Sequence, residues 1–203
     1  MSSGSCRVDA PPPPELQYDA RMRIHRRLVN LAGFLACVLM LGYALYAQFH
    51  DNLEPCPLCI FQRIGLAAIG IVFLAAALYG ARAWGRIVYA ALFFLTAATE
   101  AGIAARHIYV QHAPPGSIPA CGAPLEMMMS MFPVSEVIRK VLSGGGECAV
   151  VNWTFFGLSM PVWVLIAALL LGAIGIANNL RRPPAATIAS PDPAVLKTPQ
   201  TGA

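Results

Sequence analysis

Two cysteines separated by two residues carry the most specific chemical signal in this sequence. Cys56 and Cys59 form the tetrapeptide Cys-Pro-Leu-Cys just before a long apolar run. A bridge between them would close a loop too small to give much entropic stabilisation, so a purely structural role explains the spacing poorly. The same spacing is typical of reactive dithiols, in which one thiolate is stabilised and the disulfide opens readily. We therefore expect thiol–disulfide exchange at this motif.

A cation follows the second of these cysteines at helical spacing. The apolar run that begins at Ile64 is expected to be a helix, so Cys59 lies near its N-terminus, where partial positive charge favours a thiolate. Arg63 comes four residues after Cys59 and shares its helix face. Its guanidinium would stabilise the thiolate further and could donate hydrogen bonds to an electron-rich oxygen ligand. The alternative is that Arg63 is an interfacial anchor whose charge reaches the headgroups.

Two further cysteines, Cys121 and Cys148, lie in the long segment between the third and fourth apolar runs. We expect all four on one side of a membrane, where an oxidising compartment favours disulfides. Four cysteines allow three pairings, and the spacing favours Cys56–Cys59 together with Cys121–Cys148. A zinc site with four cysteine ligands is the alternative. Such a site normally has two close pairs, whereas Cys121 and Cys148 are 27 residues apart.

Membrane-spanning helices must position these residues. Of the 203 residues, 57% are apolar and only 12% are charged, about half the charge of a soluble domain. Backbone groups inside lipid must bond to one another, so long apolar runs are expected to be helices. Four runs approach the roughly 20 residues that a helix needs to cross a bilayer. They are 28–48, 64–81, 87–105 and 161–177, the last extending upstream through uncharged 150–160. The predicted fold is an all-α membrane protein, a four-helix transmembrane bundle.

The basic residues predict how the bundle is oriented. Ten of the 14 Lys and Arg residues lie on the side of the two termini, so the positive-inside rule places both termini in the cytoplasm. Cys6 and Cys37 are then expected to be free thiols, one in a cytoplasmic tail and one inside the first helix. We expect a largely disordered tail at 1–27, a membrane domain at 28–178 and a disordered tail at 179–203.

The same topology explains the net charge of +4. The basic cluster at 21–27 abuts the first apolar run and is expected to anchor it, so we do not expect nucleic-acid binding. The first run is also too long for the apolar part of a signal peptide, and we expect it to be retained as a membrane anchor.

A short amphipathic helix is predicted in the second extracytoplasmic loop. Apolar residues recur there at helical spacing while charged residues occupy the opposite face, a pattern typical of a helix lying on the membrane surface. The apolar positions are Val134, Val137, Ile138, Val141 and Leu142.

Taken together, these features resemble the disulfide bond formation protein B (DsbB) family of quinone-linked thiol oxidases in bacterial inner membranes. The resemblance covers roughly residues 28–178. It rests on four spans with cytoplasmic termini, Cys56-x-x-Cys59 followed by Arg63, the pair Cys121 and Cys148 in the second loop, and the segment Trp153-Thr-Phe-Phe-Gly-Leu-Ser-Met-Pro-Val-Trp163. Each feature alone is weak, and their combination in this order is specific.

The resemblance implies an electron relay through four catalytic cysteines. A reduced thioredoxin-fold oxidase of the periplasm (DsbA-like) would attack the Cys121–Cys148 disulfide and form a mixed disulfide with Cys121. Cys148 would then exchange with Cys56. Cys59, beside Arg63, would pass the electrons to a membrane quinone, ubiquinone or menaquinone, through a thiolate–quinone charge-transfer contact. The redox loops would face the periplasm.

Other polar residues near the predicted site have two interpretations each. By the same resemblance, His107 would supply a proton or a hydrogen bond to a reduced quinone; alternatively it is simply solvated at the interface. Glu100 lies within the third span, where an ionisable group indicates a functional site. It would pair with Arg106 or Arg63, or reach the headgroups. Gln62 departs from the family pattern, in which an acid often precedes the arginine.

Three other functions compete with this interpretation. One is a vitamin K epoxide reductase-like thiol oxidoreductase, although in that family the active Cys-x-x-Cys lies near a late span. The second is a membrane metal-binding or transport protein that uses the cysteines as soft ligands. The third is a structural four-span scaffold with disulfide-linked loops.

Overall fold

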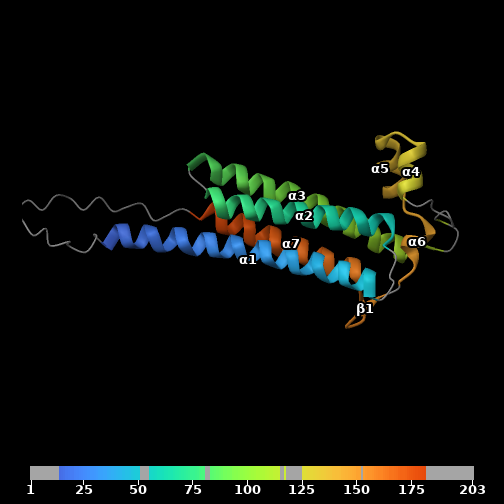
Figure 1. Cartoon of the computed structure of the whole chain (residues 1–203), viewed down its shortest axis with the longest axis horizontal. Coiled ribbons are helices and arrows are strands. Elements are labelled where there is room, and N and C mark those ends of the chain that lie inside the picture. Colours follow the sequence, from blue (N-terminus) through green and yellow to red (C-terminus); the bar gives the residue numbers. More distant parts are fainter. Residues whose placement is uncertain are drawn as a thin grey trace, which may run out of the picture.

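Four long helices run side by side along one axis and form a bundle (Figure 1). The structure, a computed structural model, describes residues 14–50, 55–80, 83–114, 117, 125–151 and 153–181. The long helices are α1 (Pro14–His50), α2 (Pro57–Tyr79), α3 (Ala83–Gln111) and α7 (Met160–Leu180). Each contains a stretch long and apolar enough to cross a membrane. The predicted all-α, four-helix transmembrane fold is confirmed.

The bundle core is made by close packing of α2 and α3 with their neighbours. The rings of Phe73 on α2 and Phe93 on α3 lie 4.5 Å apart between centroids, and both side chains are fully buried. Small residues bring α3 and α7 together, because a Cβ atom at Gly172 would lie 2.5 Å from the Cβ of Ala97. Outward-facing side chains are apolar as well; Leu39 is 73% exposed and Phe94 is 62% exposed. Such a surface is stable only against lipid.

A buried polar cluster joins α1 to α7 at the end of the bundle remote from the Cys-x-x-Cys motif. The side-chain amide of Asn178 donates to Asn30 Oδ1 over 2.9 Å, and that of Asn179 donates to the same oxygen over 3.3 Å. Arg26 also donates to the backbone oxygen of Asn179 over 2.9 Å. Polar side chains that bond across helices hold membrane bundles together, so this cluster fixes the register of α1 against α7.

Helix α1 begins at Pro14, well before the predicted span. Residues 14–27 are therefore helical, where we expected a largely disordered tail. Proline is favoured at a first helical position. Charged residues limit the part of a helix that can lie in lipid, but the helix itself can continue through them. At the other end α7 continues to Leu180. The remaining predicted disorder, at 1–13 and 182–203, lies outside the described residues.

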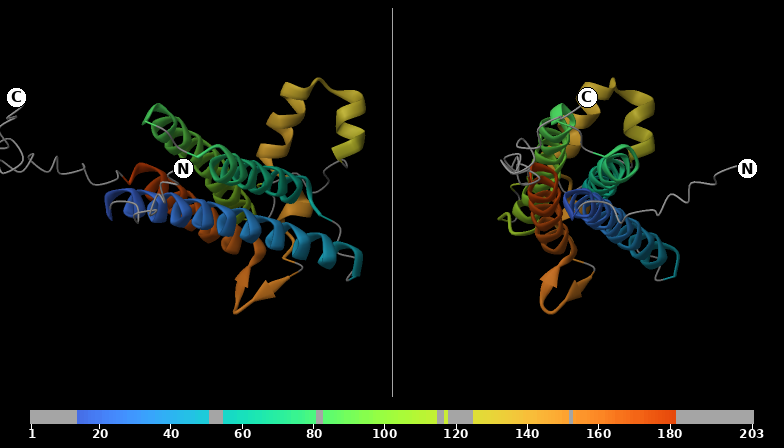
Figure 2. Two further views of the ribbon diagram at one scale, coloured as in Figure 1. Left: turned by 60° about the vertical axis from the view of Figure 1, so that its left-hand side comes forward. Right: turned by 90° about the vertical axis from the view of Figure 1, so that its left-hand side faces the viewer.

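The described residues of the loop after α3 form three short helices where one was expected. The predicted surface helix is confirmed as α5 (Val134–Ser143); α4 (Leu125–Met131) precedes it and α6 (Gly146–Ala149) follows. Figures 1 and 2 place these helices at the end of the bundle where α2 begins and α3 ends. Val137 and Val141 of α5 are buried. The contact of α5 with a membrane surface stays a prediction.

A small hairpin precedes α7, where the sequence suggested an upstream extension of the apolar helix. Its strands are β1 (Thr154–Phe155) and β2 (Leu158–Ser159), paired antiparallel. The two turn residues both have positive φ, 51° at Phe156 and 75° at Gly157, as a tight type I′ turn requires. Uncharged composition alone did not distinguish this turn from a helix. The hairpin is joined to α3 because Ser159 Oγ donates to Gln111 Oε1 over 2.7 Å.

Candidate active site

Cys56 and Cys59 lie at the start of α2, as the sequence predicts. Cys56 is the N-cap residue, Pro57 follows at the first helical position, and the Cys56 sulfur accepts a hydrogen bond from the Cys59 backbone N–H over 3.3 Å. This thiol cap and the proline together fix where the helix begins. The two sulfurs are 2.9 Å apart as a hydrogen-bonded dithiol, compared with about 2.05 Å in a disulfide. The Cys56–Cys59 disulfide stays a prediction.

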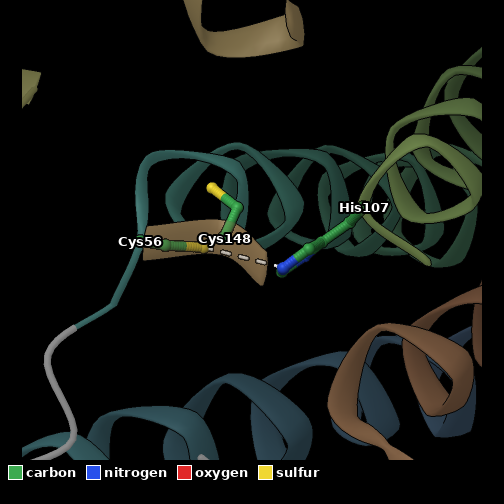
Figure 3. Close-up of side chains that lie close together, drawn as sticks. All are labelled: Cys56, His107 and Cys148. Carbon is green, nitrogen blue, oxygen red and sulfur yellow. Dashed lines mark hydrogen bonds between the residues drawn. The ribbon is translucent and has the colours of Figure 1, made fainter. Parts of the chain in front are cut away.

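Helix α6 brings Cys148 of the second loop to the same place. Its side chain is 1% exposed, and its sulfur lies within 4.8 Å of both the Cys56 sulfur and the His107 imidazole (Figure 3). The first and second loops therefore meet through their cysteines. Cys121 lies outside the described residues, and its predicted bond to Cys148 stays a prediction.

Two features of the loop hold Cys148 in position. Arg106 of α3 donates to the backbone oxygens of Leu142 and Ser143, each over 2.8 Å, which binds the C-terminal end of α5 to α3. The chain then turns sharply at Gly144, which has a φ of 78°, and a Cβ atom there would lie 2.7 Å from Val110 Cγ2. Both the positive φ and the close approach require glycine. This turn directs α6 onto the first turn of α2.

The thiols of Cys56 and Cys148 differ in how readily they lose a proton. A hydrogen bond from Cys56, supported by backbone hydrogen bonds with Leu58 and Gly145, lowers the pKa of Cys148 to about 6, although burial and nearby Glu147 oppose the shift. Hydrogen bonds to Cys148 and Cys59, together with burial, raise the pKa of Cys56. Cys148 is therefore the thiolate at neutral pH and Cys56 keeps its proton.

A cavity of about 390 Å³ opens beside the dithiol, a volume in the range of small-molecule sites. Its walls come mainly from α1, α2, α3 and α7 and are mostly apolar, with aromatic side chains at Tyr43, Trp153 and Trp163. Cys59 and Arg63 both line it. The site can therefore hold an apolar, ring-shaped ligand in contact with a reactive sulfur and a guanidinium.

Arg63 is held inside the bundle by α1. Its guanidinium donates to Gln48 Oε1 and, over 3.0 Å, to the backbone oxygen of Ala44. These bonds leave other N–H groups of the five-donor guanidinium for a ligand. Gln48 was not singled out in the sequence. Only its position eight residues before Cys56, near the membrane face where the motif lies, could have indicated it.

The structure answers both questions left open about the third span. His107 is 2% exposed and its Nε2 atom lies 3.8 Å from the Cys56 sulfur, so the solvated interpretation is wrong. Glu100 is fully buried and packs against Gly65. Within the described part of the chain neither of its carboxylate oxygens has a hydrogen-bond partner. The predicted pairing with Arg106 or Arg63 is also wrong, because both guanidinium groups bind elsewhere.

Comparison with known proteins identifies the family. The family described as "Disulfide bond formation protein DsbB" matches residues 26–178. The chain belongs to the DsbB family. Curated relatives named disulfide bond formation protein B agree. That of Nitrosococcus oceani is 48% identical over 155 residues, which is 76% of this chain and 92% of the relative. The protein of Methylococcus capsulatus is 49% identical over 150 residues, which is 74% of this chain and 92% of the relative.

Membership in the DsbB family establishes the general role of the protein. The protein is a multi-pass membrane oxidoreductase of disulfide bond formation. A vitamin K epoxide reductase-like assignment is therefore wrong. The DsbB match, over residues 26–178, includes α2, α3, most of α1 and α7 and the loop that carries Cys148, so the gathered thiols lie inside the matched region.

We predict that the reduced protein shows a thiolate transition near pH 6 that belongs to Cys148. Because its pKa is lowered, the thiolate is present above about pH 6 and is lost as the pH falls through that value. The measurement is ultraviolet thiolate absorbance against pH, compared with a Cys148→Ser variant. Cys56→Ala should move the transition to higher pH, and Cys37→Ser should not. A Cys148-dependent transition at about pH 8.5, the ordinary cysteine value, would contradict the assignment.

Proposed function

We propose that the protein is a thiol:quinone oxidoreductase that reoxidises a periplasmic, thioredoxin-fold dithiol oxidase (DsbA-like) and passes the electrons to a membrane quinone. The observation that carries this proposal is the placement of Cys148 beside the Cys56–Cys59 dithiol at a cavity lined by Arg63. One sulfur cluster thus connects a loop accessible to a soluble partner with a site open to membrane ligands.

The first half of the reaction uses the second loop. A thiolate of the reduced partner attacks Cys121 in a Cys121–Cys148 disulfide, and Cys148 leaves as a thiolate. A leaving thiol of low pKa departs faster, and the backbone hydrogen bonds of Cys148 with Leu58 and Gly145, which do not depend on a Cys56 thiol, lower its pKa. The second thiol of the partner then releases Cys121, so the partner becomes a disulfide.

The second half passes the electron pair into the first loop. The Cys148 thiolate attacks the Cys56 sulfur of a Cys56–Cys59 disulfide, and Cys59 leaves at the helix N-terminus beside Arg63, where a thiolate is stabilised. The Cys121 thiol that the partner released then attacks Cys148, which restores the Cys121–Cys148 disulfide and frees Cys56, so that the Cys56–Cys59 dithiol carries the electron pair. A bound quinone would supply a two-electron, two-proton acceptor next to Cys59. Overall, a partner dithiol becomes a disulfide, and the two electrons and two protons leave on the quinol.

The residues around the cavity fit a quinone. Apolar and aromatic walls suit its ring, and the donors that line the cavity and could meet its carbonyl oxygens include Arg63, Gln62, Gln111 and His107. Gln62 is buried and its Nε2 atom has no partner among the described residues, so a ligand oxygen would satisfy it. These groups would bind and orient the ring, and His107 would hold or transfer a proton at Nε2.

The orientation of the protein is part of the same proposal. We infer that it lies in a bacterial inner membrane with both termini in the cytoplasm, because most Lys and Arg residues flank the spans on that side. The loops that carry the four relay cysteines then face the periplasm, where an oxidising environment and a soluble partner are both available.

Purified protein should reduce a quinone when supplied with a reduced DsbA-like donor. Cys59→Ser and Cys121→Ser should each lower this turnover by more than about 1,000-fold, because each removes a reacting sulfur. Cys6→Ser and Cys37→Ser should leave it unchanged; Cys37 is buried in the core, so its variant also controls for folding. Loss of activity in a folded Cys37→Ser variant, or turnover without Cys59, would contradict the relay.

Arg63→Ala should raise the KM for quinone about 10- to 100-fold, as expected for loss of a hydrogen bond from a charged donor worth about 1.5–3 kcal/mol. Thiol exchange with the donor, followed without quinone, should change much less. Gln48→Ala is the matched control for Arg63→Ala, because it removes the hydrogen bond from Arg63 to α1 and keeps the charge of Arg63. An unchanged quinone dependence in Arg63→Ala would reject the placement of the quinone beside Arg63.

A further inference from the structure

We propose that the reduced protein binds one Zn²⁺ ion between Cys56, Cys148 and His107, with Cys59 as the fourth ligand. The binding itself requires only the geometry of these side chains. Its effect on turnover, discussed below, rests on the proposed function.

The three central donors come from three different elements and converge on one point. Cys56 precedes α2, His107 is on α3 and Cys148 is on α6, and their ligand atoms all lie within 4.8 Å of one another (Figure 3). Tetrahedral zinc, with Zn–S of about 2.3 Å and Zn–N of about 2.0–2.1 Å, separates its ligand atoms by about 3.5–3.8 Å. The distance from the Cys56 sulfur to His107 Nε2 is already 3.8 Å.

Cys59 completes the set. Its sulfur is 2.9 Å from that of Cys56 but lies outside the group whose ligand atoms are all within 4.8 Å of one another, so binding requires its side chain to turn toward the other ligands. Three thiolates and one imidazole form one of the standard ligand sets of tetrahedral zinc. The bound site would carry one net negative charge, and Arg63, which lines the adjoining cavity, supplies a nearby positive charge.

His107 makes no strong contact within the protein that would oppose ligation, and a zinc ion at Nε2 would displace the proton that this atom carries in the proposed quinone reaction. It is 2% exposed and its Nε2 atom is directed at the Cys56 sulfur (Figure 3). At a separation of 3.8 Å these two atoms make at most a weak contact, so zinc coordination would not displace a strong hydrogen bond. Its Nδ1 atom lacks a hydrogen-bond partner within the described ranges. Because such outer partners strengthen zinc sites about 10- to 100-fold, we expect moderate affinity.

The oxidation state of the protein would control the site. A Cys56–Cys59 disulfide removes two ligands, and a disulfide at Cys148 removes a third, so only the reduced protein can bind the ion. Binding displaces the protons that the three sulfurs still carry and transfers no electrons. The occupied site would withhold the sulfurs of Cys56 and Cys59 from reoxidation to a disulfide, so zinc would hold the reduced enzyme in an inactive state.

The test is titration of full-length protein in detergent with Co²⁺, a spectroscopic substitute for zinc. Protein reduced with a phosphine should give the visible absorption of tetrahedral, thiolate-bound cobalt at one ion per chain, and Zn²⁺ should displace it. Oxidised protein should give none. His107→Ala should weaken binding at least about tenfold, while His112→Ala, a matched histidine near the same end of α3, should not change it.

Several outcomes would overturn the inference. They are equal binding by oxidised protein, unchanged affinity in His107→Ala, and failure of Zn²⁺ to protect Cys56 and Cys148 from alkylation. Loss of binding in Cys121→Ser would show that the ligand set is different. Quinone reduction in metal-free buffer, measured on the same sample, separates the two proposals. Active protein that binds no Co²⁺ overturns the zinc site alone, and inactive protein that binds it overturns the relay alone.

Discussion

The contact between Cys148 and the first turn of α2 is the interaction on which the rest of the site depends. It places a thiolate-forming sulfur of the second loop within 4.8 Å of Cys56, and thiol–disulfide exchange requires direct attack of one sulfur on another. Arg106 and Gly144 maintain the contact by fixing the end of α5 and the turn into α6. The structure of the second loop therefore serves to hold the Cys148 sulfur in position.

The membrane environment constrains how polar groups can be arranged around this contact. Large apolar side chains cover the outside of the bundle, so charged and hydrogen-bonding groups must be satisfied internally. Arg63 meets this requirement by donating to Gln48 and Ala44 of α1, which also places its guanidinium at the cavity. The same bonds that satisfy the arginine within the bundle thus hold it where an oxygen ligand beside Cys59 could be bound.

The sequence predicted the elements that follow from strong local rules and missed those that depend on tertiary packing. Long uncharged runs were sufficient to predict the four spans, and the position of the Cys-x-x-Cys motif directly before the second run placed Cys59 near the start of α2. The early start of α1 was missed because hydropathy indicates which part of a helix crosses the lipid and does not indicate where the helix begins or ends. The burial of His107 against Cys56 and the role of Gln48 depend on packing between distant segments, and the local turn at Phe156 was missed because its uncharged sequence was taken as part of a helix. Glu100 was recognised as unusual, but its burial against Gly65 could not be read from spacing.

The most direct test of the account is disulfide mapping in a Cys59→Ser/Cys121→Ser variant, in which Cys56 and Cys148 are the remaining relay cysteines. Mild oxidation followed by mass spectrometry of the unreduced protein identifies the bond that forms. The account predicts rapid formation of an intramolecular Cys56–Cys148 disulfide, slowed when Gly144 is changed to Ala because the turn into α6 is strained. Two free thiols after oxidation, or bonds only between separate chains, would contradict it.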